Sequence, residues 1–152
     1  SVGGLYVLML KINLVCVGTL KEKYLADACS EYQKRLSRFC RLSVVELPEL
    51  DPEKEGRRIL EKLEGFTVAL CVEGKKLSSE GFAELIAAKS LEFSTYTFVI
   101  GGSEGLSDEV KRNCRYALSF SAMTFPHQLM RVILLEQLYR GFMINAHNPY
   151  HK

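Results

Sequence analysis

The sequence lacks the cysteine and histidine patterns that mark disulfide frameworks and metal sites. Its cysteines are odd in number and form neither a CxxC motif nor a Cys/His cluster with metal-ligand spacing. They are Cys16, Cys29, Cys40, Cys71 and Cys114. We therefore expect no metal site, and reduced thiols that serve as small buried hydrophobic side chains in a cytoplasmic protein.

A membrane-spanning segment is also missing. The apolar run from Leu5 to Val17 is interrupted by Lys11 and Asn13, has no basic segment before it and is short for a membrane span. Neither secretion nor membrane insertion is expected. Met9 is the expected natural start, and residues 1–8 are expected to be an expression remnant or a weakly specified extension.

Signatures of several common enzyme classes are absent. The sequence contains no GxxxxGK[ST] phosphate loop, no GxGxxG dinucleotide fingerprint and no GxSxG nucleophile elbow. Besides Glu73, the only carboxylate near the candidate loops described below is Glu104. These absences argue against P-loop, dinucleotide-dependent and serine-hydrolase activities.

The composition is that of one folded domain. Of 152 residues, 47% are hydrophobic and 25% are charged, without a low-complexity tract, linker or repeat, so residues 9–152 are expected to form a single domain. A chain of this size can bury a core without disulfides or metal. The formal charge of +2 is too small to indicate nucleic-acid binding by field strength alone.

Short β-branched runs alternate with helical periods along the chain, and the order is strand then helix, five times over. We expect an α/β fold with a mostly parallel sheet flanked by helices. Expected strands cover residues 12–17, 42–47, 66–72, 96–100 and 116–120. The third has little polarity and is expected to be central, with a loop at 73–77 after it. Asp51 and Ser107 are expected helix N-caps.

The last predicted helix is apolar around most of its circumference. Starting at Pro126, it carries aliphatic and aromatic residues that cannot all face one sheet. A second buried face is therefore required, and a homodimer interface would provide it most easily.

Ligands of open parallel sheets bind outside the carboxyl ends of the strands, which directs attention to the loops after Val72, Ile100 and Phe120. Gly101 and Gly102 allow backbone amides to approach a ligand, although a tight strand-to-helix turn would use the same residues. The uncharged segment 119–126 suits a pocket for a flat, mostly apolar heterocycle, or else a buried connection.

Three further residues are candidates for chemistry or RNA contact. His127 begins a helix and is either a proton-transfer group or a surface residue beside the cap. In the polar tail, Tyr150 could stack on a base and Lys152 could meet a phosphate, although tails of this kind are often disordered.

Long segments of the chain together resemble the RlmH (YbeA-like) family of SPOUT methyltransferases. The resemblance covers about residues 9–152 and is strongest in three segments: Phe98-Val99-Ile100-Gly101-Gly102-Ser103-Glu104-Gly105-Leu106-Ser107, Ser119-Phe120-Ser121-Ala122-Met123-Thr124-Phe125-Pro126-His127-Gln128-Leu129-Met130-Arg131 and Asn148-Pro149-Tyr150-His151-Lys152. Several matches in the right order are more specific than any one motif.

The resemblance implies a C-terminal trefoil knot, a homodimer and S-adenosyl-L-methionine as methyl donor. The implied reaction is methylation of N3 of a pseudouridine in the helix 69 loop of 23S rRNA, with the ribosome as substrate and no DNA or membrane partner. By position, the residues similar to the family's cofactor-binding residues are Leu70, Gly101, Gly102, Phe120, Ser121, Ala122, Met123, Thr124 and Phe125.

The catalytic candidates are His127, Tyr150 and Lys152, with His151 beside them and His127 favoured for proton transfer. Lys152 stands where some members have arginine, which keeps the charge but loses the planar fork that grips phosphate. Two alternatives remain open: a SPOUT enzyme acting on another rRNA or tRNA nucleotide, and a ribosome-binding module without catalytic activity.

Overall fold

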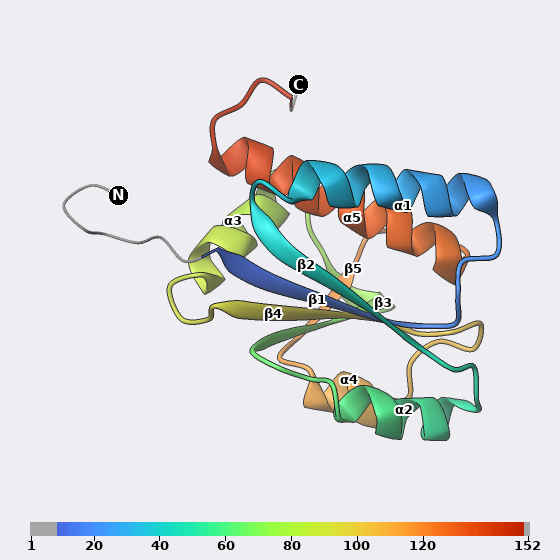
Figure 1. Cartoon of the computed structure of the whole chain (residues 1–152). Helices are drawn as coiled ribbons and strands as arrows, with labels where there is room; N and C mark the ends of the chain where they lie inside the picture. The colour runs from blue at the N-terminus through green and yellow to red at the C-terminus, as the bar shows by residue number, and fades with distance from the viewer. Residues whose placement is uncertain (1–8, 151–152) are drawn as a thin grey trace.

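Five parallel strands form one sheet in the order β2-β1-β4-β3-β5 in the computed structural model, which describes residues 9–150 (Figure 1). The strands are β1 (Leu10–Val17), β2 (Cys40–Leu47), β3 (Phe66–Lys76), β4 (Thr95–Ile100) and β5 (Tyr116–Ser119). The helices are α1 (Lys23–Leu36), α2 (Pro52–Leu60), α3 (Ser79–Lys89), α4 (Asp108–Asn113) and α5 (His127–Asn145). The predicted α/β class and the strand–helix order are confirmed.

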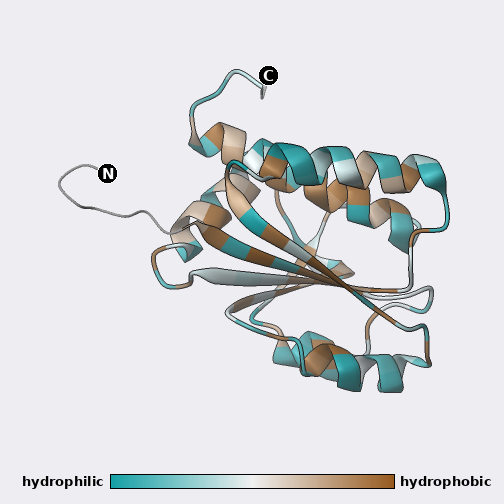
Figure 2. Ribbon diagram, viewed as in Figure 1, coloured by the Kyte–Doolittle hydropathy of each residue, from teal (hydrophilic) through white to brown (hydrophobic). Residues whose placement is uncertain are grey.

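Helices cover both faces of the sheet, with α1, α3 and α5 on one side and α2 and α4 on the other (Figure 1). The alternation of side chains along β1 produces this arrangement. Ile12 and Leu14 belong to the larger hydrophobic cluster, whereas Val15 and Val17 belong to a second cluster on the opposite face. Figure 2 shows hydrophobic stretches along β1 that are interrupted by hydrophilic bands.

Strand β3 is longer than predicted. The segment expected to be a loop at 73–77 continues the strand to Lys76, because Lys75 pairs with Leu118 and Lys76 with Ser119 on β5. Leu70 also pairs with Leu118, so the intervening residues form an irregularity in the ladder. β3 lies between β4 and β5, inside the sheet as expected, but the middle strand is β4.

The apolar circumference of α5 is largely covered within the chain. Helix α5 packs against both α1 and α3, and Leu134, Leu135 and Leu138 have no exposed surface. The neighbouring helices therefore supply much of the second buried face that the sequence requires, and a homodimer interface on this helix stays a prediction.

Local capping follows the sequence closely. The Asp51 carboxylate accepts a hydrogen bond from the Lys54 amide at 2.9 Å, and the Ser107 hydroxyl accepts one from the Val110 amide at 3.3 Å. Both predicted N-caps are confirmed. These side chains satisfy backbone donors that the first helical turn leaves without partners.

All five cysteines are free, and Cys16, Cys29 and Cys40 are buried. Burial raises the pKa of the Cys16 and Cys40 thiols to about 12, because a low-dielectric environment disfavours the thiolate. The prediction of buried, reduced thiols is confirmed for these three, while Cys71 and Cys114 are half-buried. Among residues 9–150, no helix is both long and apolar enough to cross a membrane.

We expect Leu134→Ala to lower the free energy of unfolding by about 2–5 kcal/mol, because Leu134 is fully buried and its truncation leaves a cavity. Leu91→Ala is the matched control, since Leu91 is 89% exposed and should change stability by less than about 0.5 kcal/mol. Chemical denaturation of both variants measures the difference. Equal stability of the two would contradict the described core.

Candidate functional site

A cleft of about 650 Å³ lies at the carboxyl ends of β3, β4 and β5. Its walls come from the end of β3, from the loop after β4 and from the segment that joins β5 to α5, with Lys111 and Met130 added from α4 and α5. The sequence indicated the segments after β4 and β5 as loops, and it placed a third loop where β3 continues as a strand. The volume lies within the usual range for small-molecule sites.

One wall of the cleft is mainly backbone. The chain turns tightly after β4, and the amide of Gly105 donates a hydrogen bond of 3.0 Å to the Gly102 carbonyl. A Cβ on Gly101 would lie only 2.7 Å from the carbonyl carbon of Gly105, so the close approach requires glycine. The tight turn considered from sequence therefore exists, and it also lines the cleft.

A second wall is the segment between β5 and α5. The Ser119 hydroxyl donates to the Ser121 carbonyl at 2.9 Å, and the Ser121 hydroxyl accepts from the Met123 amide at 2.9 Å. Met123 is 72% exposed, whereas Phe120 packs edge-on against Phe82 of α3. The segment is a self-bonded surface loop, which argues against the alternative of a buried connection.

An ion pair stands at the edge of the cleft. The ammonium group of Lys111 on α4 contacts the carboxylate of Glu73 on β3, and both residues line the cleft. The hydrogen bond from Lys111 lowers the pKa of Glu73, and the same bond raises the pKa of Lys111. The sequence analysis did not identify Lys111 as a site residue. Its position on the short helix that follows the glycine loop was the feature that could have indicated it.

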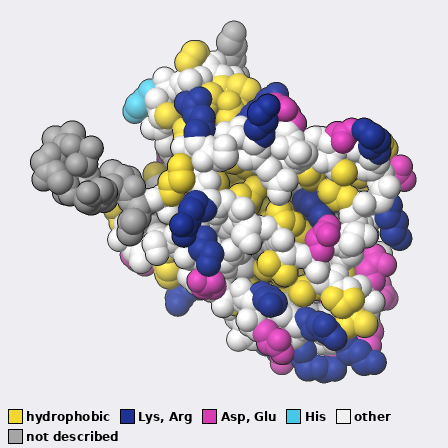
Figure 3. All heavy atoms as spheres, viewed as in Figure 1, with side chains coloured by type: hydrophobic (Ala, Val, Ile, Leu, Met, Phe, Trp, Pro, Cys, Tyr) yellow, Lys and Arg dark blue, Asp and Glu magenta, His cyan; other side chains and the backbone are white. Residues whose placement is uncertain are grey.

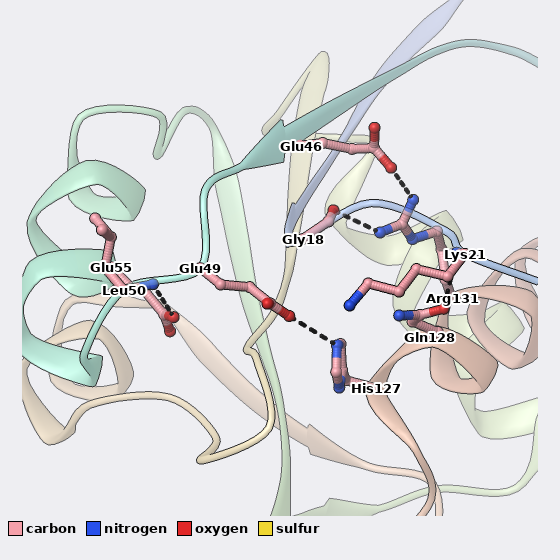
Figure 4. A network of polar contacts seen from close by, with 9 residues as sticks. All are labelled: Gly18, Lys21, Glu46, Glu49, Leu50, Glu55, His127, Gln128 and Arg131. Carbon is pink, nitrogen blue, oxygen red and sulfur yellow. Dashed lines mark hydrogen bonds and ion pairs between the residues drawn. The ribbon is translucent and has the colours of Figure 1, made fainter.

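His127 is the first residue of α5 and lines the cleft. Its side chain is 22% exposed, and its Nε2 atom lies 3.9 Å from Oε1 of Glu49 (Figure 4). Nε2 is buried without a hydrogen-bond partner within the described part of the chain. A buried, unpaired ring nitrogen at the edge of a cleft is a candidate for proton transfer.

The first turns of α5 are fixed to the sheet by Arg131. Its guanidinium donates to the Glu46 carboxylate at 2.6 Å and to the Gly18 carbonyl at 3.2 Å, and the residue is 3% exposed (Figure 4). The side-chain oxygen of Gln128 also accepts a hydrogen bond from the Lys21 amide at 3.2 Å. These bonds hold the helix start that carries His127.

The structure brings most of the predicted site residues together. Those that line the cleft are Leu70, Gly101, Gly102, Phe120, Ser121, Met123, Thr124, Phe125 and His127. Ala122 belongs to the same loop but is not among the lining residues. Lys152 and His151 lie outside the described residues.

Tyr150 lies away from the cleft of its own chain. Its hydroxyl donates to Glu136 at 2.7 Å, and its ring packs edge-on against Tyr139 with centroids 4.9 Å apart. Burial raises the pKa of the Tyr150 hydroxyl. The tail therefore packs against α5 up to Tyr150, which argues against a disordered tail over that stretch.

Known proteins resemble this chain along nearly its whole length. A family model described as "Predicted SPOUT methyltransferase" matches residues 10–151. The chain is 54% identical to Ribosomal RNA large subunit methyltransferase H from Bifidobacterium animalis subsp. lactis (strain AD011) and 47% identical to the protein of that name from Streptococcus pyogenes serotype M12 (strain MGAS2096). Each alignment covers 94% of this chain and all of the relative.

A solved structure shares the fold at low sequence identity. The structure of a probable methylase family protein from Haemophilus influenzae Rd KW20 superposes with a TM-score of 0.59 and 12% identity, over 93% of this chain and 70% of that one. The family model and both relatives agree with the resemblance inferred from sequence, and the chain belongs to the SPOUT methyltransferase family.

Proposed function

We propose that this protein transfers a methyl group from S-adenosyl-L-methionine to N3 of a pseudouridine in the helix 69 loop of 23S rRNA. The identity with two proteins named Ribosomal RNA large subunit methyltransferase H, over their full length, is the observation that carries the proposal. The choice of nucleotide and atom comes from the family resemblance. The trefoil knot implied by that resemblance stays a prediction.

The residues of the cleft fit the methyl donor. Gly101 and Gly102 let the turn pack closely against Gly105, Val17 and Glu55, so the cleft has a wall of backbone whose amides suit the hydrogen-bonding edge of an adenine ring. Leu70 and the loop 120–125 add apolar surface and small polar groups. When bound, S-adenosyl-L-methionine supplies an electrophilic methyl group on a sulfonium.

His127 is the proposed general base of the reaction. The imide proton on N3 must leave before or during methyl transfer, and a neutral imidazole at the edge of the cleft can accept it. The electron pair freed from the N3–H bond would then form the bond to the methyl carbon, while the bond from that carbon to the sulfonium sulfur breaks and leaves its electron pair on sulfur. The remaining contribution of the chain is alignment in a site from which water is excluded.

The surface charge favours a structured RNA target over free RNA. Basic and acidic side chains are interspersed on the face in Figure 3, and the net charge is only +2. Few phosphates can then be neutralised, so binding to an isolated RNA fragment should be weak. An assembled ribosome supplies further contact area, and a ribosomal substrate implies that the proposed activity takes place in the cytoplasm.

A homodimer in which each tail completes the other site explains the position of Tyr150. Within one chain, Tyr150 is bonded to Glu136 and packs against Tyr139, and it does not line the cleft that contains His127. A site that uses both residues would therefore draw Tyr150 from a second copy of the chain. Two copies related by a twofold axis, with antiparallel α5 helices, would place the tail of one near the cleft of the other.

The reaction is tested by incubating the protein with ribosomes that lack the modification and with methyl-labelled S-adenosyl-L-methionine. Label is expected on one nucleotide of 23S rRNA, in the helix 69 loop, and far less on naked rRNA because the contact area is smaller. Mass analysis of nuclease fragments locates the label. Methylation at another nucleotide would favour another SPOUT substrate. No methylation of the ribosomes would favour a non-catalytic module.

We expect Gly101→Ala to weaken S-adenosyl-L-methionine binding by at least about tenfold, or about 1.4 kcal/mol, because the new methyl group collides with the Gly105 backbone. Gly81→Ala is the control, since Gly81 is not among the residues that line the cleft and its Cβ would meet side-chain atoms of Ser78 and Leu77 at 3.3 Å or more. Titration calorimetry measures both. Equal affinities would place the cofactor elsewhere.

The dimer is tested by mixing two impaired variants, Gly101→Ala and Tyr150→Phe. In a mixed dimer, one site would combine an intact cleft with an intact tail, so partial activity is expected to return after subunit exchange. Methyl incorporation into ribosomes is the measurement. Full activity of Tyr150→Phe alone, or no recovery in the mixture, would indicate a site made by a single chain.

A further inference from the structure

A series of polar contacts beside the cleft leads to the His127 ring. The residue of that series next to the ring is Glu49. From this geometry we propose that Glu49 is a positioning residue for His127. Its carboxylate accepts a hydrogen bond from the Nε2–H group of the imidazole and leaves Nδ1 free to take the proton from the substrate. This inference rests on the proposed function, since it assigns His127 the role of base.

The contact involves the Nε2 atom of His127. This atom is buried and has no hydrogen-bond partner within residues 9–150, while the Glu49 carboxylate lies 3.9 Å away. Buried ring nitrogens are normally paired, because water cannot reach them. The Glu49 side chain is 52% exposed, so it has the freedom to close the remaining gap and form a hydrogen bond.

The backbone of Glu49 is held by a buried carboxylate on α2. Glu55 is 6% exposed and accepts a hydrogen bond of 2.8 Å from the Leu50 amide, the residue after Glu49 (Figure 4). Both Glu55 carboxylate oxygens also lie 3.5 Å from the position that a Cβ on Gly102 would occupy. One buried side chain therefore sets the Glu49 loop and stands beside the glycine turn of the cleft.

Gly18 provides the space in which the Glu49 side chain lies. Gly18 has a φ of +86°, and a Cβ there would stand 3.1 Å from Oε1 of Glu49. The same glycine accepts the Arg131 hydrogen bond through its carbonyl group. Gly18, which follows β1, thus contacts both the Glu49 side chain and the side chain that fixes the start of α5.

The orientation of the His127 ring determines which of its nitrogens can act as the base. Figure 4 shows Nε2 directed toward Glu49 and Nδ1 on the side of the ring away from it. A neutral imidazole carries one proton, and an acceptor at Nε2 selects the tautomer in which Nδ1 is the free base. When the N3–H bond of the substrate breaks, its proton goes to Nδ1, and the Glu49 carboxylate stabilises the resulting imidazolium.

The experiment compares Glu49→Ala, Glu49→Asp, His127→Asn and the control Glu53→Ala, an exposed carboxylate in the first turn of α2. His127→Asn is expected to lower kcat by on the order of 100-fold, and Glu49→Ala by about tenfold because it acts through the histidine. KM for S-adenosyl-L-methionine should not change. Glu49→Asp should retain most of the activity, and Glu53→Ala all of it.

A spectroscopic measurement separates positioning from a general effect on structure. Nitrogen-15 spectra of the histidine rings, recorded where the ring is neutral and assigned with His127→Asn, should show the Nε2–H tautomer in the wild type and a shift toward the Nδ1–H tautomer in Glu49→Ala. An unchanged tautomer, unchanged kcat, or a loss confined to KM would overturn the inference. Absence of ribosome methylation by the wild type would refute the proposed function, and the tautomer measurement would still decide the contact.

Discussion

The buried guanidinium of Arg131 is the interaction on which the geometry of the site most depends. A charge with 3% exposure is stable only where partners replace its water, and Glu46 and the Gly18 carbonyl supply them from the ends of β2 and β1. Removing one partner of such a pair typically costs about 3–5 kcal/mol. The start of α5, and with it His127, is therefore fixed to the carboxyl edge of the sheet more firmly than a loop contact would allow.

One wall of the cleft is mainly backbone, and the opposite wall is mainly side chains. The glycine turn after β4 contributes amides whose position is set by the sheet, and it excludes side chains through the contact between Gly101 and Gly105. The opposite wall is built from Ser119, Ser121 and Phe120, whose hydroxyl bonds and ring contacts keep an exposed loop in one shape. A site assembled this way is pre-formed, so little ordering has to accompany ligand binding.

Local patterns predicted the parts of this structure that local interactions decide. Hydrophobic periodicity identified the strand and helix order, capping residues identified Asp51 and Ser107, and the rule for parallel sheets identified the two cleft loops after β4 and β5. The extension of β3 to Lys76 was missed because it depends on pairing with Leu118 and Ser119, more than forty residues away. Lys111 was missed for the same reason, since its partner Glu73 is on another element.

The sequence could not show which side chains cover α5 or where the tail packs. Coverage of α5 by α1 and α3 follows from the crossing of the chain over the sheet, which hydrophobic periodicity does not encode. Tyr150 likewise finds Glu136 and Tyr139 only after the helix has folded.

The packing of the tail then becomes a constraint on function, because Tyr150 is held against Glu136 and Tyr139 and does not line the cleft that contains His127. A reaction that needed both residues would draw Tyr150 from a second copy of the chain. The apolar residues of α5 that its neighbours leave half-buried, such as Val132 and Ile133, are where a second copy would add contact. The same helix would thus fix the base in one site and direct the tail toward another.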